Sequence, residues 1–183
     1  MTRSSARQVL ATGDLAPALA ELKHWLGITR TADDAQLAAL IGAGVEACER
    51  FTGLTPLAST IEETRDASHE WAWLTTQPIV QVVRIEALAD DGTRTALGEG
   101  EYDLHLAGDG SARLRLRHGP FVSRVVVTLA AGLAADWASL PDGLRHGVLR
   151  FAAFLHREGE QGAGEPPAAI AALWRPWRQV RLA

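Results

Sequence analysis

Apolar residues recur at intervals of three and four along three stretches of the chain, the spacing of one face of an α-helix. This pattern predicts helices over residues 15–26, 33–52 and 142–158. The middle stretch is the longest, and its apolar face consists of Leu37, Leu40, Ile41, Val45, Cys48 and Phe51. We expect these helices to form a helical core, and a short fourth helix is predicted over 168–174.

The 33–52 helix is bounded by recognisable start and stop signals. Asp33 or Asp34 can accept a hydrogen bond from a free backbone N–H at its start. Gly53 stands where a left-handed residue often ends a helix.

Glycines interrupt two of these predicted helices, at Gly42 and Gly44 in the second and at Gly143 and Gly147 in the third. Each glycine costs about 1 kcal/mol relative to alanine in a helix interior. We therefore expect close approach of a neighbouring element, in the same subunit or in another.

Between residues 57 and 131 the pattern changes to alternation of polar and apolar residues, which is typical of β-strands. Arg113, Arg115 and Arg117 alternate with leucines and predict a strand with one cationic and one apolar face. The Asp91-Gly92 pair predicts a tight hairpin turn. The strands are expected at 61–65, 70–74, 79–88, 101–106, 112–117 and 123–131.

These patterns predict an α+β protein with a helical core, an antiparallel β layer over about 57–131 and an extended C-terminal arm. Residues 1–13 are polar and small, and we expect them to be flexible. One domain is expected over 14–160. Residues 161–183 are expected to form a hinge and the arm, because 159–167 are rich in glycine and proline.

The charge distribution is uneven, although the net charge of −4 argues against a general nucleic-acid binder. Residues 86–103 hold six acidic residues and one arginine, whereas 174–183 hold three arginines and no acid. The two regions could meet differently charged neighbours. The alternative is a solvated acidic loop and an unattached basic tail.

The sequence offers no recognisable catalytic or metal-binding pattern. Its six histidines do not share a ligand spacing, and its one cysteine, Cys48, lies on the apolar face of a predicted helix. No nucleophile elbow or phosphate-binding loop is present in the 183 residues. No apolar run approaches the roughly 18–20 residues that span a bilayer. We predict no enzyme activity, no cofactor and no membrane association.

The tryptophans suggest where binding could occur. Trp71 and Trp73 alternate on a predicted strand, so they face the same side of the core or of an interface. Trp174 and Trp177 follow the predicted hinge, and tryptophan and arginine are enriched at binding hot spots. Docking to another protein is therefore expected for this segment. The alternative is that both tryptophans fold back onto their own domain.

Several segments, taken in order, resemble the head–tail connector (adaptor) proteins of long-tailed phages, prophages and gene transfer agents. The resemblance covers about residues 16–160. Its Trp- and Arg-rich end is most similar to the gene transfer agent and alphaproteobacterial prophage versions. The matching segments are LAELKHWLGIT (19–29), DDAQLAALIGAGVEACERFTG (33–53), TTQPIVQVVRIEALADDGT (75–93), EYDLHL (101–106), VVVTLAAG (125–132) and LPDGLRHGVLRFAAFLHREGE (140–160).

The resemblance implies a structural subunit of a phage-like particle, assembled in the bacterial cytoplasm. About a dozen copies would form a ring below the portal protein, with DNA passing through without sequence recognition and a tail-side neck (stopper) protein beneath. The family's C-terminal arm reaches the portal. The corresponding residues here are Trp174, Arg175, Pro176, Trp177, Arg178, Val180, Arg181 and Leu182.

Two further expectations follow from a ring. Contacts between neighbouring subunits are expected at Gly42, Gly44, Gly143 and Gly147. An acidic loop with Asp90, Asp91, Glu99 and Glu101 would face the channel or the tail. The alternative function is a small regulatory or peptide-binding module that uses its β layer.

Overall fold

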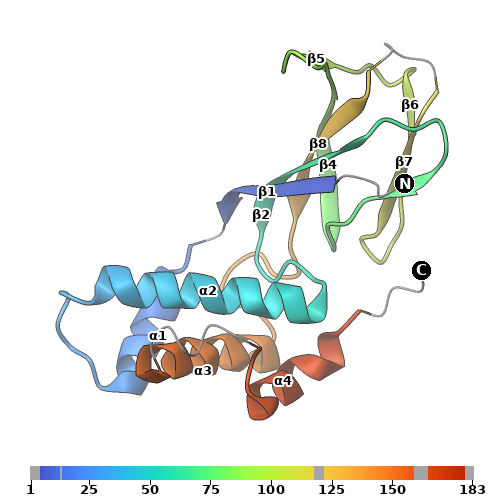
Figure 1. Cartoon of the computed structure of the whole chain (residues 1–183). Coiled ribbons are helices and arrows are strands. Elements are labelled where there is room, and N and C mark those ends of the chain that lie inside the picture. The colour runs from blue at the N-terminus through green and yellow to red at the C-terminus, as the bar shows by residue number, and fades with distance from the viewer. Residues whose placement is uncertain (1–4, 13, 118–121, 159–164, 180–183) are drawn as a thin grey trace. The chain divides into compact units, whose positions relative to one another are not determined.

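The computed structural model describes residues 5–12, 14–117, 122–158 and 165–179. These residues divide into two compact units (Figure 1). Unit 1 holds the described residues of 1–12 and 58–132, and unit 2 holds those of 13–57 and 133–183. The sequence predicted a single domain over 14–160, whereas in the structure the strand-rich segment forms a unit separate from the helices.

Unit 1 consists of two antiparallel sheets. The larger sheet has the strand order β1–β2–β8–β4–β5, and the smaller one has the order β3–β7–β6. The strands span Ser5–Thr12 (β1), Ser59–Asp66 (β2), Ala72–Trp73 (β3), Ile79–Leu88 (β4), Arg94–Ala96 (β5), Tyr102–Leu106 (β6), Ala112–Leu116 (β7) and Arg124–Ala131 (β8).

The apolar faces of both sheets contribute to one core, which makes unit 1 a small sandwich. In β7, Leu114 and Leu116 are buried, whereas Arg113 and Arg115 are half-buried on the opposite face. The predicted cationic face is thus confirmed for these two arginines. The buried core residues are Leu74, Ile79, Ile85, Ala112, Leu114, Leu116, Val125, Val127 and Leu129.

Two strands were not predicted. Residues 5–12, expected to be flexible, form β1, which pairs with β2 from Ser5↔Arg65 to Thr12↔Ser59. A strand at the edge of a sheet can be held by backbone hydrogen bonds alone and does not need alternating apolar side chains. The sequence of β1 therefore carries only a weak strand pattern. The three-residue β5 pairs with the end of β4 and is fully exposed, which leaves no alternation to detect.

Unit 2 is helical, and its helix bounds agree with the prediction to within one or two residues. The helices are α1 (Ala16–Leu26), α2 (Asp34–Thr52), α3 (Asp142–Glu158), α4 (Ala168–Trp174) and the short 3-10 helix η2 (Arg175–Trp177). Together with the two sheets of unit 1 they confirm the predicted α+β class. Leu37, Ile41, Val45 and Cys48 of α2 are buried in the helical core, as their spacing indicated.

The predicted stop signal of α2 is confirmed, and the helix starts where predicted, with Asp33 at its N-cap position, but without the expected side-chain capping bond. Gly53 has φ 76°, and its N–H donates to the carbonyl of Glu49 at 2.8 Å. Asp33 makes no capping hydrogen bond from its side chain and instead accepts from Arg30 Nε at 2.7 Å. Asp34 accepts from Lys23 Nζ of α1 at 2.5 Å. The Lys23–Asp34 pair therefore links α1 to α2, whereas the exposed Arg30–Asp33 pair is local to the loop that leads into α2.

Candidate interaction surfaces

The C-terminal segment packs against its own unit through Trp174. The indole is fully buried, and its Nε1 donates to the carbonyl of Leu144 in α3 at 3.4 Å. Its ring centroid lies 6.0 Å from that of Phe51 and 6.1 Å from that of Phe151. The folded-back alternative thus describes Trp174 in this structure, because a buried indole in an aromatic cluster is not free to dock elsewhere.

The glycines of α3 make room for this segment. A Cβ built on Gly147 would lie 2.8 Å from Cδ1 and Cε2 of Trp174. A Cβ on Gly143 would lie 3.3 Å from the carbonyl oxygen of Leu173. Close approach of a neighbouring element was expected at both positions, and that element belongs to the same chain.

The glycines of α2 differ from each other. A Cβ on Gly44 would lie 3.1 Å from the carbonyl oxygen of Val148, so this glycine allows α2 and α3 to approach. Gly42 has no atom within 4 Å of such a Cβ. Packing within the chain accounts for Gly44, Gly143 and Gly147, so their presence no longer argues for a contact between subunits. Only Gly42 retains open space for one.

Beyond Trp174 the segment is more accessible. Arg175, Pro176 and Arg178 are exposed, and Trp177 is half-buried. The Arg178 guanidinium lies 5.6 Å from the centroid of the Phe51 ring, a cation–π contact that orients it along α2. The predicted arm residues Val180, Arg181 and Leu182 lie outside the described residues.

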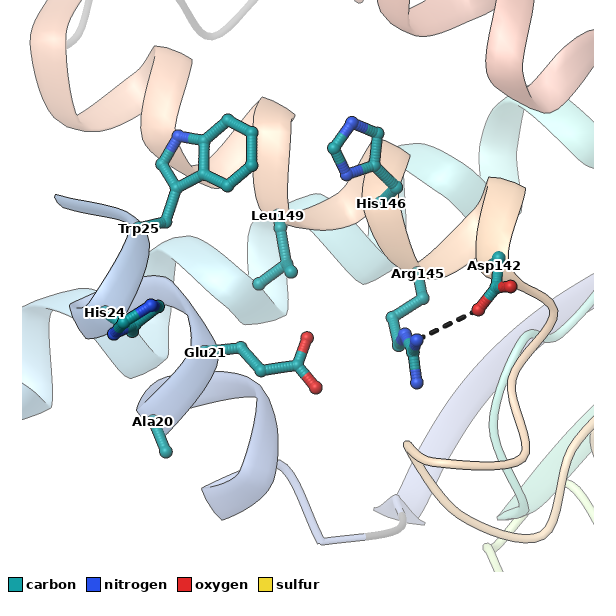
Figure 2. Close-up of a pocket in the computed structure, with 8 residues that line it drawn as sticks. All are labelled: Ala20, Glu21, His24, Trp25, Asp142, Arg145, His146 and Leu149. Carbon is teal, nitrogen blue, oxygen red and sulfur yellow. Dashed lines mark hydrogen bonds and ion pairs between the residues drawn. The ribbon is translucent and has the colours of Figure 1, made fainter.

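A hollow of about 610 Å³ lies between α1 and α3 (Figure 2). Trp25 is half exposed there and meets the ring of His146 edge-on at 5.5 Å. Figure 2 also shows the Glu21 side chain extending from α1 toward Arg145 of α3, which donates to Asp142 at 2.9 Å. None of the lining residues is a serine, threonine or cysteine that could act as a nucleophile; they are Ala20, Glu21, His24, Trp25, Asp142, Arg145, His146 and Leu149.

The acidic residues predicted to form one loop lie in two turns of unit 1. Asp90 and Asp91 occupy the exposed β4–β5 turn, where Asp90 accepts from Ser123 and Asp91 accepts from the backbone N–H of Thr93. The latter bond lowers the pKa of Asp91. Glu99 and Glu101 follow β5, and Glu101 accepts from the N–H of Gly98 at 2.7 Å. These hydrogen bonds hold the side chains of Asp90, Asp91 and Glu101 in defined positions on their turns.

Nothing in the described residues assembles a reactive centre. Among them, no group of three or more histidine, cysteine, aspartate or glutamate side chains could hold a metal ion. Burial, with a smaller effect from Glu49, raises the pKa of Cys48 to about 12, so its thiol stays protonated. No helix in the described part of the chain is long and apolar enough to cross a membrane.

The tryptophans and arginines of the smaller sheet share one face, a pairing that the sequence did not predict. Trp73 of β3 is 58% exposed and lies opposite Arg113 of β7. The Arg113 guanidinium lies 4.7 Å from the ring centroid of Trp71 and 5.8 Å from that of Trp73. Each strand's alternation was visible in the sequence, but their pairing was not.

Comparison with known proteins identifies the fold. No family model and no curated protein matches this sequence. Solved structures do match. The chain is similar to a chain of the neck of an empty gene transfer agent particle computed with C6 symmetry, with a TM-score of 0.76 and 21% identity over 97% of both chains.

Two further matches come from native particles. A chain of the virion of a native gene transfer agent particle gives a TM-score of 0.76 and 24% identity over 97% of both chains. A chain of the neck of a native particle, computed with C12 symmetry, gives 0.73 and 24% over 100% of this chain and 98% of that one. This chain shares their fold. Both units are included, because the matches run nearly from end to end.

Proposed function

We propose that this protein is a structural subunit of the neck of a phage-like particle, a head–tail connector that forms a ring below the portal. The observation that carries the proposal is the likeness in fold over 97% or more of the chain to neck and virion chains of gene transfer agent particles. The resemblance of its ordered sequence segments to the connector family supports the same role independently.

The C6 and C12 symmetries of the similar neck structures support a ring as the form of assembly. A ring needs heterologous contacts, in which one surface of a subunit binds a different surface of the next. Under this proposal DNA passes through the ring without sequence recognition. The carboxylates of Glu99 and Glu101, in the turn after β5, suit a channel or tail-side surface, because like charge keeps DNA from adhering.

The portal-binding role is proposed for the accessible part of the C-terminal segment. Arg175, Pro176 and Arg178 are exposed, and Trp177 is half-buried beside them. Trp174 then has a different role. It anchors the segment to α3, and the residues after it run along unit 2, where the N–H of Gln179 donates to the carbonyl of Thr52 at 2.8 Å.

Electron microscopy of the protein mixed with the portal protein encoded beside it tests the proposal. We expect a ring of this chain stacked on the portal, with the segment after Trp174 at the contact. No association near physiological salt would contradict a neck role and favour the alternative of a binding module that uses its β layer.

Point variants locate the contact without disturbing the core. Arg175→Glu with Arg178→Glu should weaken portal binding at least tenfold, and Trp177→Ala should cost about 2 kcal/mol of binding, as for a typical anchor. Arg30→Glu is the control, since Arg30 is an exposed arginine elsewhere in unit 2. Equal binding by all of these proteins would remove the portal role from the segment.

A further inference from the structure

The smaller sheet of unit 1 carries aromatic and cationic groups side by side on one face, where Trp73 is exposed and Trp71, Arg113 and Arg115 are half-buried. Arg113 lies against the rings of Trp71 and Trp73, and Arg115 lies 4.8 Å from the Trp71 centroid. Large aromatic side chains in the open lose little conformational entropy on binding and offer much area. Tryptophan and arginine are also the residue types most enriched at binding hot spots. This face, formed by Trp71, Trp73, Arg113 and Arg115, is called the Trp–Arg face below.

Of the two arginines of this face, Arg113 is the one without a carboxylate partner among the described residues. Asp103 of β6 accepts from Arg115 Nε at 2.8 Å and also pairs with Arg117. Arg113 has no such partner among the described residues, and its Nε is a buried nitrogen without a hydrogen bond. Because Nε is buried, a carboxylate from outside the chain would bind the terminal nitrogens of the guanidinium.

Unit 1 also carries a negatively charged turn that is complementary to the Trp–Arg face. Asp90 and Asp91 form the exposed β4–β5 turn, with Arg94 of β5 occupied by Glu62 at 2.7 Å. The end of β5 and the strands β6 and β7 lie at separate positions on unit 1 (Figure 1). Two complementary surfaces at different places on one subunit are what a head-to-tail contact requires.

We propose that the Trp–Arg face of one copy binds the Asp90–Asp91 turn of the next copy. The contact deepens the proposed neck function and rests on it for the closure of the ring. Arg113 pairs with an aspartate of the neighbour, while Trp71 and Trp73 exclude water around the ion pair. Nucleic acid is the less suitable occupant, because Asp103 lies within the face and the chain has a net charge of −4.

Charge reversal gives a direct test of the contact. In Arg113→Glu the two surfaces are both negative, and in Asp91→Arg the new arginine offsets Asp90 and removes the negative charge of the turn, so each variant alone should self-associate at least tenfold more weakly than wild type. Mixed together, the two variants present opposite charges at every contact and should recover association. Sedimentation equilibrium up to millimolar protein at low salt measures all three samples, and circular dichroism confirms folding.

Second variants keep the test decisive. Arg113→Gln and Asp90→Lys replace either protein if it fails to fold, and Arg30→Glu in unit 2 is the matched control that should associate as wild type does. Wild-type protein that remains monomeric throughout, or single variants that associate normally, would overturn the contact. Quenching of tryptophan fluorescence by an oligonucleotide that is lost in Arg113→Glu would also overturn it, in favour of nucleic acid.

The outcomes separate this contact from the neck function. A normal ring of Arg113→Glu on the portal would overturn the contact and leave the neck role standing. Self-association with the expected charge dependence, but no binding to the portal, would keep the contact and overturn the neck role.

Discussion

Two tryptophans of each unit are placed in opposite ways. In unit 2, Trp137 and Trp174 are at most 1% exposed and fill the helical core. In unit 1, Trp73 is 58% exposed and lies with Trp71 beside Arg113 on the surface of a sheet. Trp137 and Trp174 thus stabilise the helical unit, where the half-exposed Trp25 is the exception, whereas Trp71 and Trp73 are accessible to another molecule.

The difference teaches that the position opposite a tryptophan decides its role. Trp174 meets Gly147, where the absence of a side chain leaves space for an indole. Trp73 meets Arg113, whose guanidinium covers one face of the ring and leaves the rest to solvent. The following experiments test that contrast.

The largest effect is expected from Trp174→Ala. Loss of a fully buried indole from a core should lower the free energy of unfolding by about 3–5 kcal/mol. Denaturant unfolding followed by circular dichroism at a helical wavelength measures it, and Trp177→Ala, which removes a half-buried indole, should cost less. Equal losses would show that Trp174 is not the anchor of the segment.

A matched pair of glycines gives the next effect. Gly147→Ala forces the Trp174 indole to shift and should destabilise unit 2 by about 1–3 kcal/mol. Gly42→Ala, in open space within α2, should stabilise it by up to about 1 kcal/mol. The same unfolding assay compares them. If Gly42→Ala also destabilises the monomer, an unrecognised contact lies there.

A smaller effect concerns pH and unit 1. Hydrogen bonds from Arg117 and Arg115 lower the pKa of Asp103 below its ordinary value of about 3.9. The unfolded chain therefore takes up this proton first, so the stability contributed by Asp103 is present above about pH 4 and is lost as the pH falls through the folded pKa. Unfolding at pH 3–6 should show a shallower pH dependence in Asp103→Asn. An unchanged slope would mean that Asp103 does not contribute.

The smallest effect on stability is expected from Trp73→Ala. Because more than half of this side chain is exposed, its loss should change the free energy of unfolding by less than about 1 kcal/mol. The same substitution should nevertheless weaken self-association at the Trp–Arg face. A large loss of stability with unchanged association would reverse the contrast between the two units.

The sequence predicted the helices well because each makes its own pattern. The bounds of α3, 142–158, were predicted without error, since its apolar stripe and the Pro141-Asp142 start are local signals. β1 was missed because its partner β2 lies about fifty residues away, and pairing of backbones leaves little trace in side-chain type.

The candidate site residues were predicted less completely, for the same reason. Gly44, Gly143 and Gly147 did indicate close packing, unlike Gly42, but the sequence could not show that Trp174 was the group packed on Gly147. The cationic face of β7 was predicted, yet the register that sets Trp73 opposite Arg113 depends on how two distant strands pair. The sequence therefore predicted which residue types lie on one face of an element, but not which distant residues contact one another.

The interleaving of the two units has a consequence for folding order. Helices α2 and α3 must meet through Gly44 and Val148 although the whole segment 58–132 separates them. Closing so long a loop of flexible chain costs entropy that grows with its length. Once unit 1 has folded, however, its first strand after α2 pairs with its last strand before α3, at Ser59↔Ala131. The folded sandwich thus shortens the effective loop between α2 and α3. Because unit 1 is synthesised before α3, its folding on the ribosome would let α3 pack against α2 rapidly.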